Sequence, residues 1–162
     1  MTQRDVITFC VEAGRLEFYA AVLARSLRRF GGSLNQPRCI AVAPRKEHWP
    51  SERVIDFLES LDIEVLREDL NREFSIYPLL NKPLALCATE PEEGISFWLD
   101  TDIIILDDPN QQMMSDTDVM ASPVFNKNIG SSGAGDSNEP YWQALYEICG
   151  VSTERWVQSL LD

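Results

Sequence analysis

The stretch VITFCVEAGRLEFYAAVLARSLRRFGG, residues 6–32, carries the pattern that decides the fold. Its first six residues form a short apolar run of β-branched and aromatic side chains, which is typical of a strand buried on both faces of a sheet. From about residue 16 to residue 30, apolar side chains recur at helical spacing until Gly31 and Gly32 end the helix. The sequence therefore predicts a strand followed by a helix.

The same alternation continues along the chain. Further strands are predicted at 39–43, 63–66, 95–99 and 103–106, with helices at 51–61, capped by Ser51, and at about 79–89 after Pro78. Pro83 is expected to kink the second of these helices or to delay its start. Alternating strands and helices predict one domain over residues 1–162, a three-layer α/β/α fold with a mostly parallel sheet. Ligands bind beyond the carboxyl ends of such strands, after Val11, Ala43, Leu66 and Leu99.

The last third of the chain is less informative. A strand is predicted at 119–124, a helix at 139–149 that Gly150 caps, and a final helix at 152–161. The helical spacing of an apolar set predicts a face packed on the core, made by Tyr141, Trp142, Leu145 and Ile148. The glycine-rich stretch 128–137, with Gly130, Gly133 and Gly135, lacks a phosphate-binding motif and is interpreted as a surface loop, with Asp136 kept as a candidate near the site.

The composition limits the possible partners. The 162 residues are 44% hydrophobic and 25% charged, as in ordinary globular proteins, but the formal net charge is −12. So acidic a chain repels nucleic acid and anionic lipid, and neither is expected as a partner. A phosphate-bearing ligand would need a metal ion, a helix N-terminus or one well-placed cation.

The cysteines and the hydropathy suggest a location. Cys10 and Cys39 lie in predicted buried strands, Cys87 and Cys149 are far from them in sequence, and there is no CxxC pair. The first residues do not resemble a signal peptide, so free thiols in the cytoplasm are expected. No apolar run approaches the roughly 20 residues of a membrane-spanning helix, so no transmembrane segment is predicted.

Two carboxylates, Asp100 and Asp102, interrupt the apolar stretch 97–106, FWLDTDIIIL. An uncompensated buried carboxylate is costly, so a positive partner is expected. Two carboxylates completed by water and substrate phosphate are a usual way to bind Mg²⁺ or Mn²⁺. The alternative is a solvent-facing turn, since Asp107 and Asp108 lie close by. Serine-based nucleophilic catalysis is set aside because there is no GxSxG motif and His48, in a surface-loop context, is the only histidine.

The stretch WLDTDIIILDDP, residues 98–109, resembles the DxD segment of GT-A glycosyltransferases. The run VITFCV and the following helix, which carries Tyr19 and Ser26, are similar to the nucleotide-binding opening of the family-8-like members. The helix in YPLLNKPLAL, residues 77–86, precedes the DxD strand and carries Lys82. The resemblance covers residues 6 to about 124, and only the DxD context is specific.

The resemblance implies the substrate and the residues that bind it. A nucleotide-sugar, a UDP-sugar by family habit, would be the donor, and the acceptor is not identified. Asp102 would be the principal ligand of Mn²⁺ or Mg²⁺, and Asp100 would share the metal or contact the ribose. The donor-binding set implied by the resemblance also includes Lys82, for the diphosphate, Tyr19, and the loop that would cradle the base, made by Val11, Glu12, Ala13 and Gly14.

Two departures from the family pattern shape the expectation. Family-8 enzymes add a histidine ligand far downstream, whereas His48 precedes the motif. GT-A domains also normally continue further, so a domain that lacks the acceptor-binding C-terminal part is expected. Two rivals stay open: a noncatalytic α/β module that binds nucleotide or metal, and a haloacid-dehalogenase-type phosphotransferase. The second is disfavoured because its motif lies near the first strand and has Thr or Val where this chain has Ile104.

Overall fold

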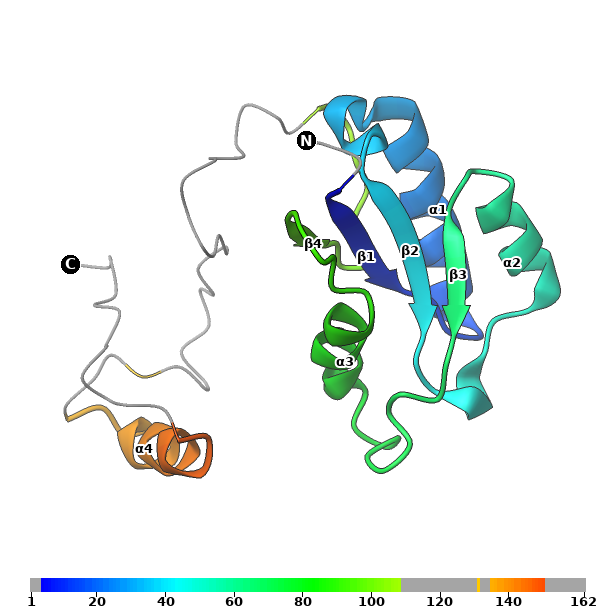
Figure 1. The fold of residues 1–162 in the computed structure, drawn as a ribbon. Helices are drawn as coiled ribbons and strands as arrows, with labels where there is room; N and C mark the ends of the chain where they lie inside the picture. The colour runs from blue at the N-terminus through cyan, green and yellow to red at the C-terminus, as the bar shows by residue number, and fades with distance from the viewer. Residues whose placement is uncertain (1–3, 109–130, 132–134, 151–162) are drawn as a thin grey trace. The chain divides into compact units, whose positions relative to one another are not determined.

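Four parallel strands form the sheet. The structure, a computed structural model, describes residues 4–108, 131 and 135–150 (Figure 1). The strands lie in the order β3-β2-β1-β4, and all of the pairings between neighbours are parallel. Their bounds are β1, Val6–Cys10; β2, Arg38–Ala43; β3, Glu64–Arg67; and β4, Ser96–Trp98. The sequence prediction of a parallel sheet is confirmed.

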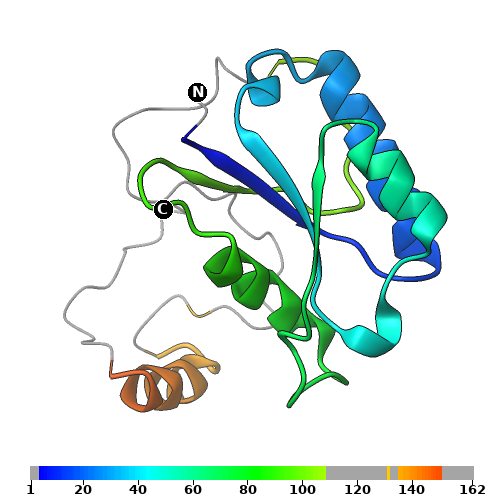
Figure 2. The ribbon, with the colours of Figure 1, turned by 45° about the vertical axis from the view of Figure 1, so that its right-hand side comes forward.

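Helices cover both faces of this sheet. Helices α1 (Arg15–Phe30) and α2 (Glu52–Glu59) lie on one face, and α3 (Asn81–Ala88) lies on the other (Figure 2). Short 3₁₀ turns connect the elements: η1, Gly32–Asn35; η2, Lys46–His48; and η3, Pro78–Leu80. The fold is therefore the three-layer α/β/α arrangement that the alternation of strands and helices predicts.

Both faces of β1 are buried, which explains its nearly continuous apolar sequence. Ile7 and Phe9 point into the cluster formed with α1 and α2, whereas Val6 and Cys10 pack in the cluster that includes Ala85 of α3. Cys39 of β2 is also buried, as predicted, and all four cysteines of the chain have free thiols. Alternate side chains of one strand thus hold the two helical layers to the sheet.

The strand predicted at 103–106 does not form. The Ile103 amide donates to the Asp100 carbonyl at 3.3 Å, which closes a turn, and the Ile105 amide donates to Ser26 Oγ of α1 at 3.0 Å. These two backbone donors are therefore not available for a sheet ladder. The segment crosses α1 in an irregular conformation, and the prediction from its apolar sequence is wrong.

Two helix starts also differ from the simple expectation. Ser51 occupies the N-cap position of α2, but its side chain makes no capping bond; its amide donates instead to the Glu17 carboxylate of α1. The predicted helix after Pro78 is divided into η3 and α3, so it starts late, as Pro83 required. Pro83 is the third residue of α3, in the first turn, where a helix amide has no intrahelical acceptor.

The chain divides into two compact units, residues 1–115 and 116–162, and the second contains α4 (Glu139–Ile148). Gly150 follows with φ of 63°, the conformation expected of its capping role. Within this unit α4 has no buried residue, and Tyr141 and Ile148 are 56% and 80% exposed, so the core face predicted for this helix stays a prediction. A helix buries its apolar stripe only against a second layer, and the described part of this unit has none.

Other expectations fall outside the described residues: the strand at 119–124, the helix at 152–161, and most of the glycine-rich loop, including Gly130 and Gly133. Within the described part of the chain, no helix has both the length and the apolar character needed to cross a membrane.

Candidate functional site

The segments that follow β1, β2 and β4 meet at the carboxyl edge of the sheet. The Val11 amide donates to the Val42 carbonyl at 2.9 Å, which continues the β1 and β2 pairing past the end of β1. On the other side of β1, the Leu99 amide donates to the Thr8 carbonyl at 3.0 Å. The sequences that carry Glu12, Arg45 and the DxD motif therefore start side by side, at the place where α/β sheets bind ligands.

Glu12 and Arg45 form a buried ion pair at this edge. Arg45 Nε donates to Glu12 Oε1 at 2.7 Å, and Nη2 donates to Oε2 at 2.5 Å, so the two planar groups meet through two parallel bonds. The Arg45 side chain is 11% exposed and the Glu12 side chain is 3% exposed. The hydrogen bond to Glu12 is the main cause that raises the pKa of the Arg45 guanidinium above its usual value.

Two asparagines extend this pair toward α3 and the loop after β3. Asn81 Nδ2 donates to Glu12 Oε1 at 3.0 Å, and Asn71 Nδ2 donates to Asn81 Oδ1 at 2.8 Å. Arg45 Nη1 donates to the Ser75 carbonyl at 2.6 Å. Asn81 and Asn71 are both buried. Each of these donor groups bonds to an oxygen atom of another segment. The hydrogen-bond network therefore connects the loops at this edge.

Lys82 and Asp100, which the resemblance assigns to one donor site, form an ion pair. Lys82 Nζ lies 3.3 Å from Asp100 Oδ1 and 5.2 Å from the centre of the Trp98 ring. Trp98 Nε1 donates to the same Asp100 oxygen at 2.5 Å. Both charged side chains are about half exposed, so the pair is reachable from solvent. Helix α3 supplies the cation, β4 supplies the indole, and the turn that follows β4 supplies the carboxylate.

Asp100 and Asp102 keep oxygens available for a cation. Both described contacts of Asp100 are made with Oδ1, which leaves Oδ2 without a partner among the described residues. Asp102 is exposed and makes no hydrogen bond or ion pair within that part of the chain. The described residues contain no group of three or more His, Cys, Asp or Glu side chains suited to a metal. Two hard carboxylates suit a Mg²⁺-type ion whose remaining ligands are water and phosphate.

Thr101, between the two aspartates, fixes the turn that carries them. Its hydroxyl donates to the Cys10 carbonyl at 2.7 Å and its side chain is buried. The bond replaces the next backbone rung between β1 and β4, so the chain can turn away at Thr101 and still remain attached to β1. Asp100 and Asp102 flank this anchored residue in the sequence.

The loop predicted to cradle the base has two parts. The side chains of Val11 and Glu12 are buried, whereas Ala13 and Gly14 are exposed. The Ala13 amide donates to the His48 carbonyl at 2.7 Å, and Gly14 has φ of 86°, which favours glycine and lets the chain turn directly into α1. The exposed surface of this loop is thus the backbone of Ala13 and Gly14 together with the methyl group of Ala13.

Tyr19, also implied by the resemblance as a donor contact, packs along its own helix. The Arg15 guanidinium lies 5.6 Å from its ring centre, and the Phe18 ring lies 6.1 Å away. These contacts do not involve Lys82 or Asp100. The structure therefore brings together Glu12, Lys82 and Asp100 from the predicted set, with Asp102 two residues beyond Asp100.

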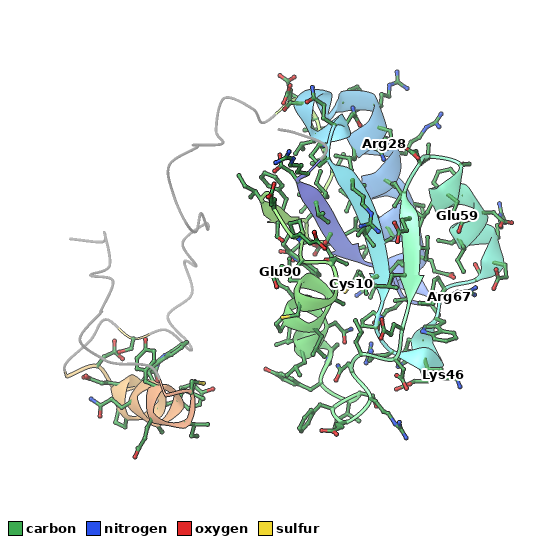
Figure 3. All side chains as sticks on the ribbon, in the orientation of Figure 1. Cys10, Arg28, Lys46, Glu59, Arg67 and Glu90 are labelled. Atoms are coloured by element: carbon green, nitrogen blue, oxygen red, sulfur yellow. The ribbon has the colours of Figure 1, made fainter. Side chains whose placement is uncertain are left out.

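The pKa of the Cys10 thiol is shifted by burial and by the charged groups of the site. Cys10 lies at the end of β1, on the side of the sheet that faces α3 (Figure 3). Burial raises the pKa of this thiol to about 12, and the negative charges of Glu12 and Asp100 add to that effect while Arg45 opposes it. Cys10 is consequently a neutral part of the core rather than a nucleophile.

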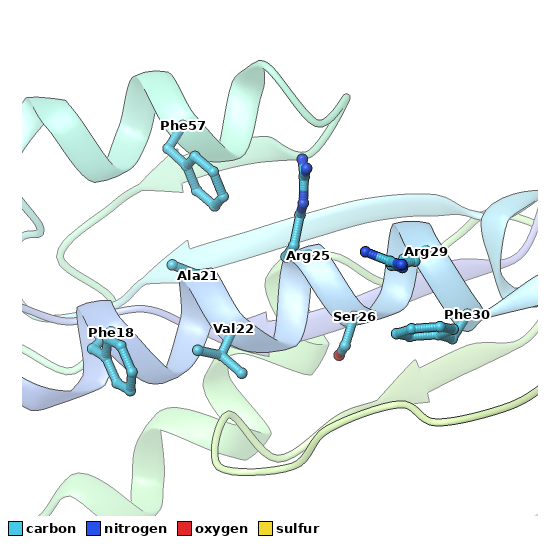
Figure 4. Close-up of a pocket in the computed structure, with 8 residues that line it drawn as sticks. All are labelled: Phe18, Ala21, Val22, Arg25, Ser26, Arg29, Phe30 and Phe57. Atoms are coloured by element: carbon cyan, nitrogen blue, oxygen red, sulfur yellow. The ribbon is translucent and has the colours of Figure 1, made fainter.

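A groove on the helical layer is chemically different from this edge. It has a volume of about 450 Å³ and lies against α1, with Phe57 of α2 pointing toward it (Figure 4). Apolar side chains such as Phe18, Val22 and Phe30 line it, together with Arg25 and Arg29. None of the described residues that line it carries a carboxylate.

The parallel sheet and the charged groups at its carboxyl edge define a ligand-binding α/β domain. A family model, the Rhodobacterales glycosyltransferase domain, matches residues 7–160, and the chain belongs to this family of glycosyltransferases. No curated protein and no solved structure matches the chain. The sequence prediction of a glycosyltransferase is thereby confirmed at the level of the family.

Sequence reasoning missed four residues of the site: Arg45, Asn71, Asn81 and Trp98. One signal for Arg45 was present, because it lies two residues after Ala43, in a segment that the strand-end rule marks for inspection. Trp98 lies in the DxD stretch, two residues before Asp100, but no sequence pattern assigns it a role. The two asparagines have no distinguishing pattern in the sequence.

Proposed function

We propose that this domain transfers a glycosyl group from a nucleotide-diphosphate sugar, a UDP-sugar, to an acceptor, with Mn²⁺ or Mg²⁺ as cofactor and a GT-A, family-8-like donor site. The observation that carries the proposal is the exposed pair Asp100 and Asp102 at the carboxyl edge of a parallel sheet, with Lys82 beside it, in a chain of a glycosyltransferase family. The pairing of Lys82 with Asp100 supports one shared site for metal and diphosphate.

Each residue has a distinct role in this proposal. Asp102 is the principal metal ligand, and Asp100 contributes its free Oδ2 while Trp98 and Lys82 hold Oδ1. When bound, the cation neutralises negative charge that develops on the departing diphosphate. Lys82 is half exposed and supplies positive charge to the diphosphate oxygens. Ala13 and Gly14 form the exposed part of the loop next to the base.

The decisive experiment measures metal-dependent nucleotide binding. Asp102→Asn should abolish Mn²⁺-dependent binding of UDP in calorimetry, and should change the free energy of unfolding by less than about 1 kcal/mol because Asp102 is an exposed, unpaired side chain. Asp107→Asn is the matched control, since it removes an exposed carboxylate five residues further along and should leave UDP binding unchanged. Equal UDP and Mn²⁺ affinities in Asp102→Asn and the unmodified protein would contradict the metal assignment.

A second assay separates an enzyme from a binding module. UDP release is measured from UDP-glucose and from UDP-galactose with Mn²⁺ over a panel of sugar acceptors. Release that depends on both donor and acceptor supports the transferase. UDP binding without any release is expected both of the noncatalytic nucleotide-binding alternative and of a donor domain without its acceptor-binding part, so acceptor-dependent release is the outcome that separates an enzyme from a binding module.

A further inference from the structure

Four segments at the carboxyl edge of the sheet meet in one buried polar cluster. We call Glu12, Arg45, Asn71 and Asn81 the Glu12 cluster. Glu12 follows β1, Arg45 follows β2, Asn71 follows β3 and Asn81 opens α3. Hydrogen bonds of 2.5–3.0 Å connect these four side chains in a single chain of contacts.

Protein donors occupy most of the Glu12 carboxylate. Its carboxylate accepts two bonds from Arg45 and one from Asn81, and its side chain is 3% exposed. A carboxylate offers about four acceptor positions, so three are occupied by protein donors. A buried ion pair is also a poor source of stability compared with apolar packing, which suggests that the pair serves to fix geometry.

Asn81 links this cluster to the cation of the proposed donor site. It is the first residue of α3 and directly precedes Lys82, whose Nζ reaches Asp100 Oδ1 at 3.3 Å and the Trp98 ring at 5.2 Å. Because the Asn81 side chain is bonded to Glu12 and to Asn71, the first turn of α3 is held against the loop after β1. The position of Lys82 depends on that attachment.

We propose that Arg45 and Asn81 are positioning residues that act through Glu12, and that they hold the loop after β1 and Lys82 in the relative positions needed to bind the nucleotide diphosphate. The inference rests on the proposed function of the same site. It assigns no contact with substrate to Arg45, Asn81 or Glu12; their effect on binding passes through Lys82 and through Ala13 and Gly14.

The first test needs no ligand. Trp98 Nε1–H donates to Asp100 Oδ1 beside Lys82, so its indole resonance in a ¹H–¹⁵N spectrum, assigned with Trp98→Phe, reports the Lys82 position. Asn81→Ala should shift this resonance, and adding Lys82→Met should then produce a much smaller further shift than it produces in the unmodified protein. Glu64→Gln breaks the exposed Arg38 pair elsewhere on the sheet and should leave the resonance in place. An unshifted Trp98 resonance in folded Asn81→Ala would overturn the proposal.

The second test is a double-mutant cycle on UDP affinity with Mg²⁺. Lys82→Met should weaken UDP binding roughly tenfold, the scale of one charge-assisted hydrogen bond. Asn81→Ala should weaken it several-fold, and the double variant should bind about as weakly as Lys82→Met alone, because Asn81 acts by holding Lys82. Losses that multiply in the double variant would show an independent structural effect and would contradict the proposed route.

Arg45 is tested with a conservative and a disruptive variant. Arg45→Lys keeps the charge but loses the planar two-donor fork, so it should fold and bind UDP several-fold more weakly. Arg45→Met should bind more weakly still, with urea unfolding measured beside it to show that the comparison is made on folded protein. UDP affinity unchanged in Arg45→Lys would remove Arg45 from the proposal. If the unmodified protein does not bind UDP, the proposed function fails, while the Trp98 resonance still decides whether Asn81 positions Lys82.

Discussion

Replacing Thr101 with valine tests whether one buried hydroxyl holds the DxD turn on the sheet. Thr101 Oγ1 donates to the Cys10 carbonyl at 2.7 Å, and the Thr101 side chain is 9% exposed. Valine has nearly the same shape but no hydroxyl, so Thr101→Val removes the donor without opening a cavity. The Cys10 carbonyl is then left at the end of β1 without that partner, and water has little access to it.

The magnitude follows from these two effects. A typical intramolecular hydrogen bond contributes about 1 kcal/mol net, and a buried carbonyl left without a donor costs about 1–3 kcal/mol. Small relaxation of the turn recovers part of the loss, so we expect Thr101→Val to lower the free energy of unfolding by about 2 kcal/mol. Since Asp100 and Asp102 flank Thr101, the variant should also bind Mg²⁺ more weakly.

Urea unfolding followed by circular dichroism measures the first effect, and calorimetry with Mg²⁺ and UDP measures the second. Thr101→Ser is the control, because it keeps the hydroxyl and should lie close to the unmodified protein in both assays. An unfolding free energy of Thr101→Val within about 0.5 kcal/mol of the unmodified protein would refute the anchoring role. Equal destabilisation by Thr101→Ser and Thr101→Val would refute it as well, since the hydroxyl would not be the cause.

Two further predictions concern the buried thiols and the turn at Gly94. Burial raises the pKa values of the Cys10 and Cys39 thiols to about 12, from an ordinary value of 9.0, so their contribution to stability should be complete below about pH 9 and decrease between pH 9 and 12. In mass spectrometry, iodoacetamide at pH 9 should modify the exposed Cys87 and spare Cys10 and Cys39 in the native protein; alkylation of Cys10 at the same rate would contradict its burial. Gly94 has φ of 121°, and an added Cβ would lie 2.5 Å from the Arg4 carbonyl oxygen, so Gly94→Ala should lower the unfolding free energy by more than about 1 kcal/mol, and an unchanged urea midpoint would contradict this.

The two central strands, β1 and β2, could be predicted because each is a mostly apolar run that is buried on both faces of the sheet. The run at 6–11 could be predicted from local sequence because it is rich in β-branched and aromatic residues and is too short for a helix. The run at 103–106 has the same composition, yet its fate depends on Ser26 of α1, which takes the Ile105 amide. The hydrogen-bond acceptor of the Ile105 amide is thus a side chain 79 residues away in the sequence. The local spacing of apolar residues cannot predict such a contact.

The candidate site could be predicted where its residues stand together in one local motif. Asp100 and Asp102 stand out because they interrupt an apolar sequence, and Lys82 was placed near them by the resemblance; the structure pairs Lys82 with Asp100. Glu12 was predicted to belong to the loop near the base, but its pairing with Arg45 depends on which strands lie side by side. The order of strands in the sheet is a tertiary fact, so the partner of Glu12 could not be read from the sequence.

The charge balance of this edge supplies the final argument for a metal ion. Arg45 is paired with Glu12, Lys82 is paired with Asp100, and Asp102 is exposed, so these five side chains carry two positive and three negative charges. A nucleotide diphosphate approaching them meets a net negative site in a chain whose formal charge is already −12. Repulsion of this kind weakens binding unless a cation compensates it.

UDP binding should therefore depend on divalent cation even though Lys82 is present. EDTA should lower UDP affinity at least tenfold, a loss of about 1.4 kcal/mol, and added Mg²⁺ should restore it. Raising the salt concentration tests the same argument, because screening reduces the repulsion between UDP and the carboxylates and should narrow the difference between the EDTA and Mg²⁺ measurements. UDP affinity that is equal in EDTA and in Mg²⁺ at low salt would mean that Lys82 alone outweighs Asp100 and Asp102, and that these carboxylates hold no metal in the nucleotide complex.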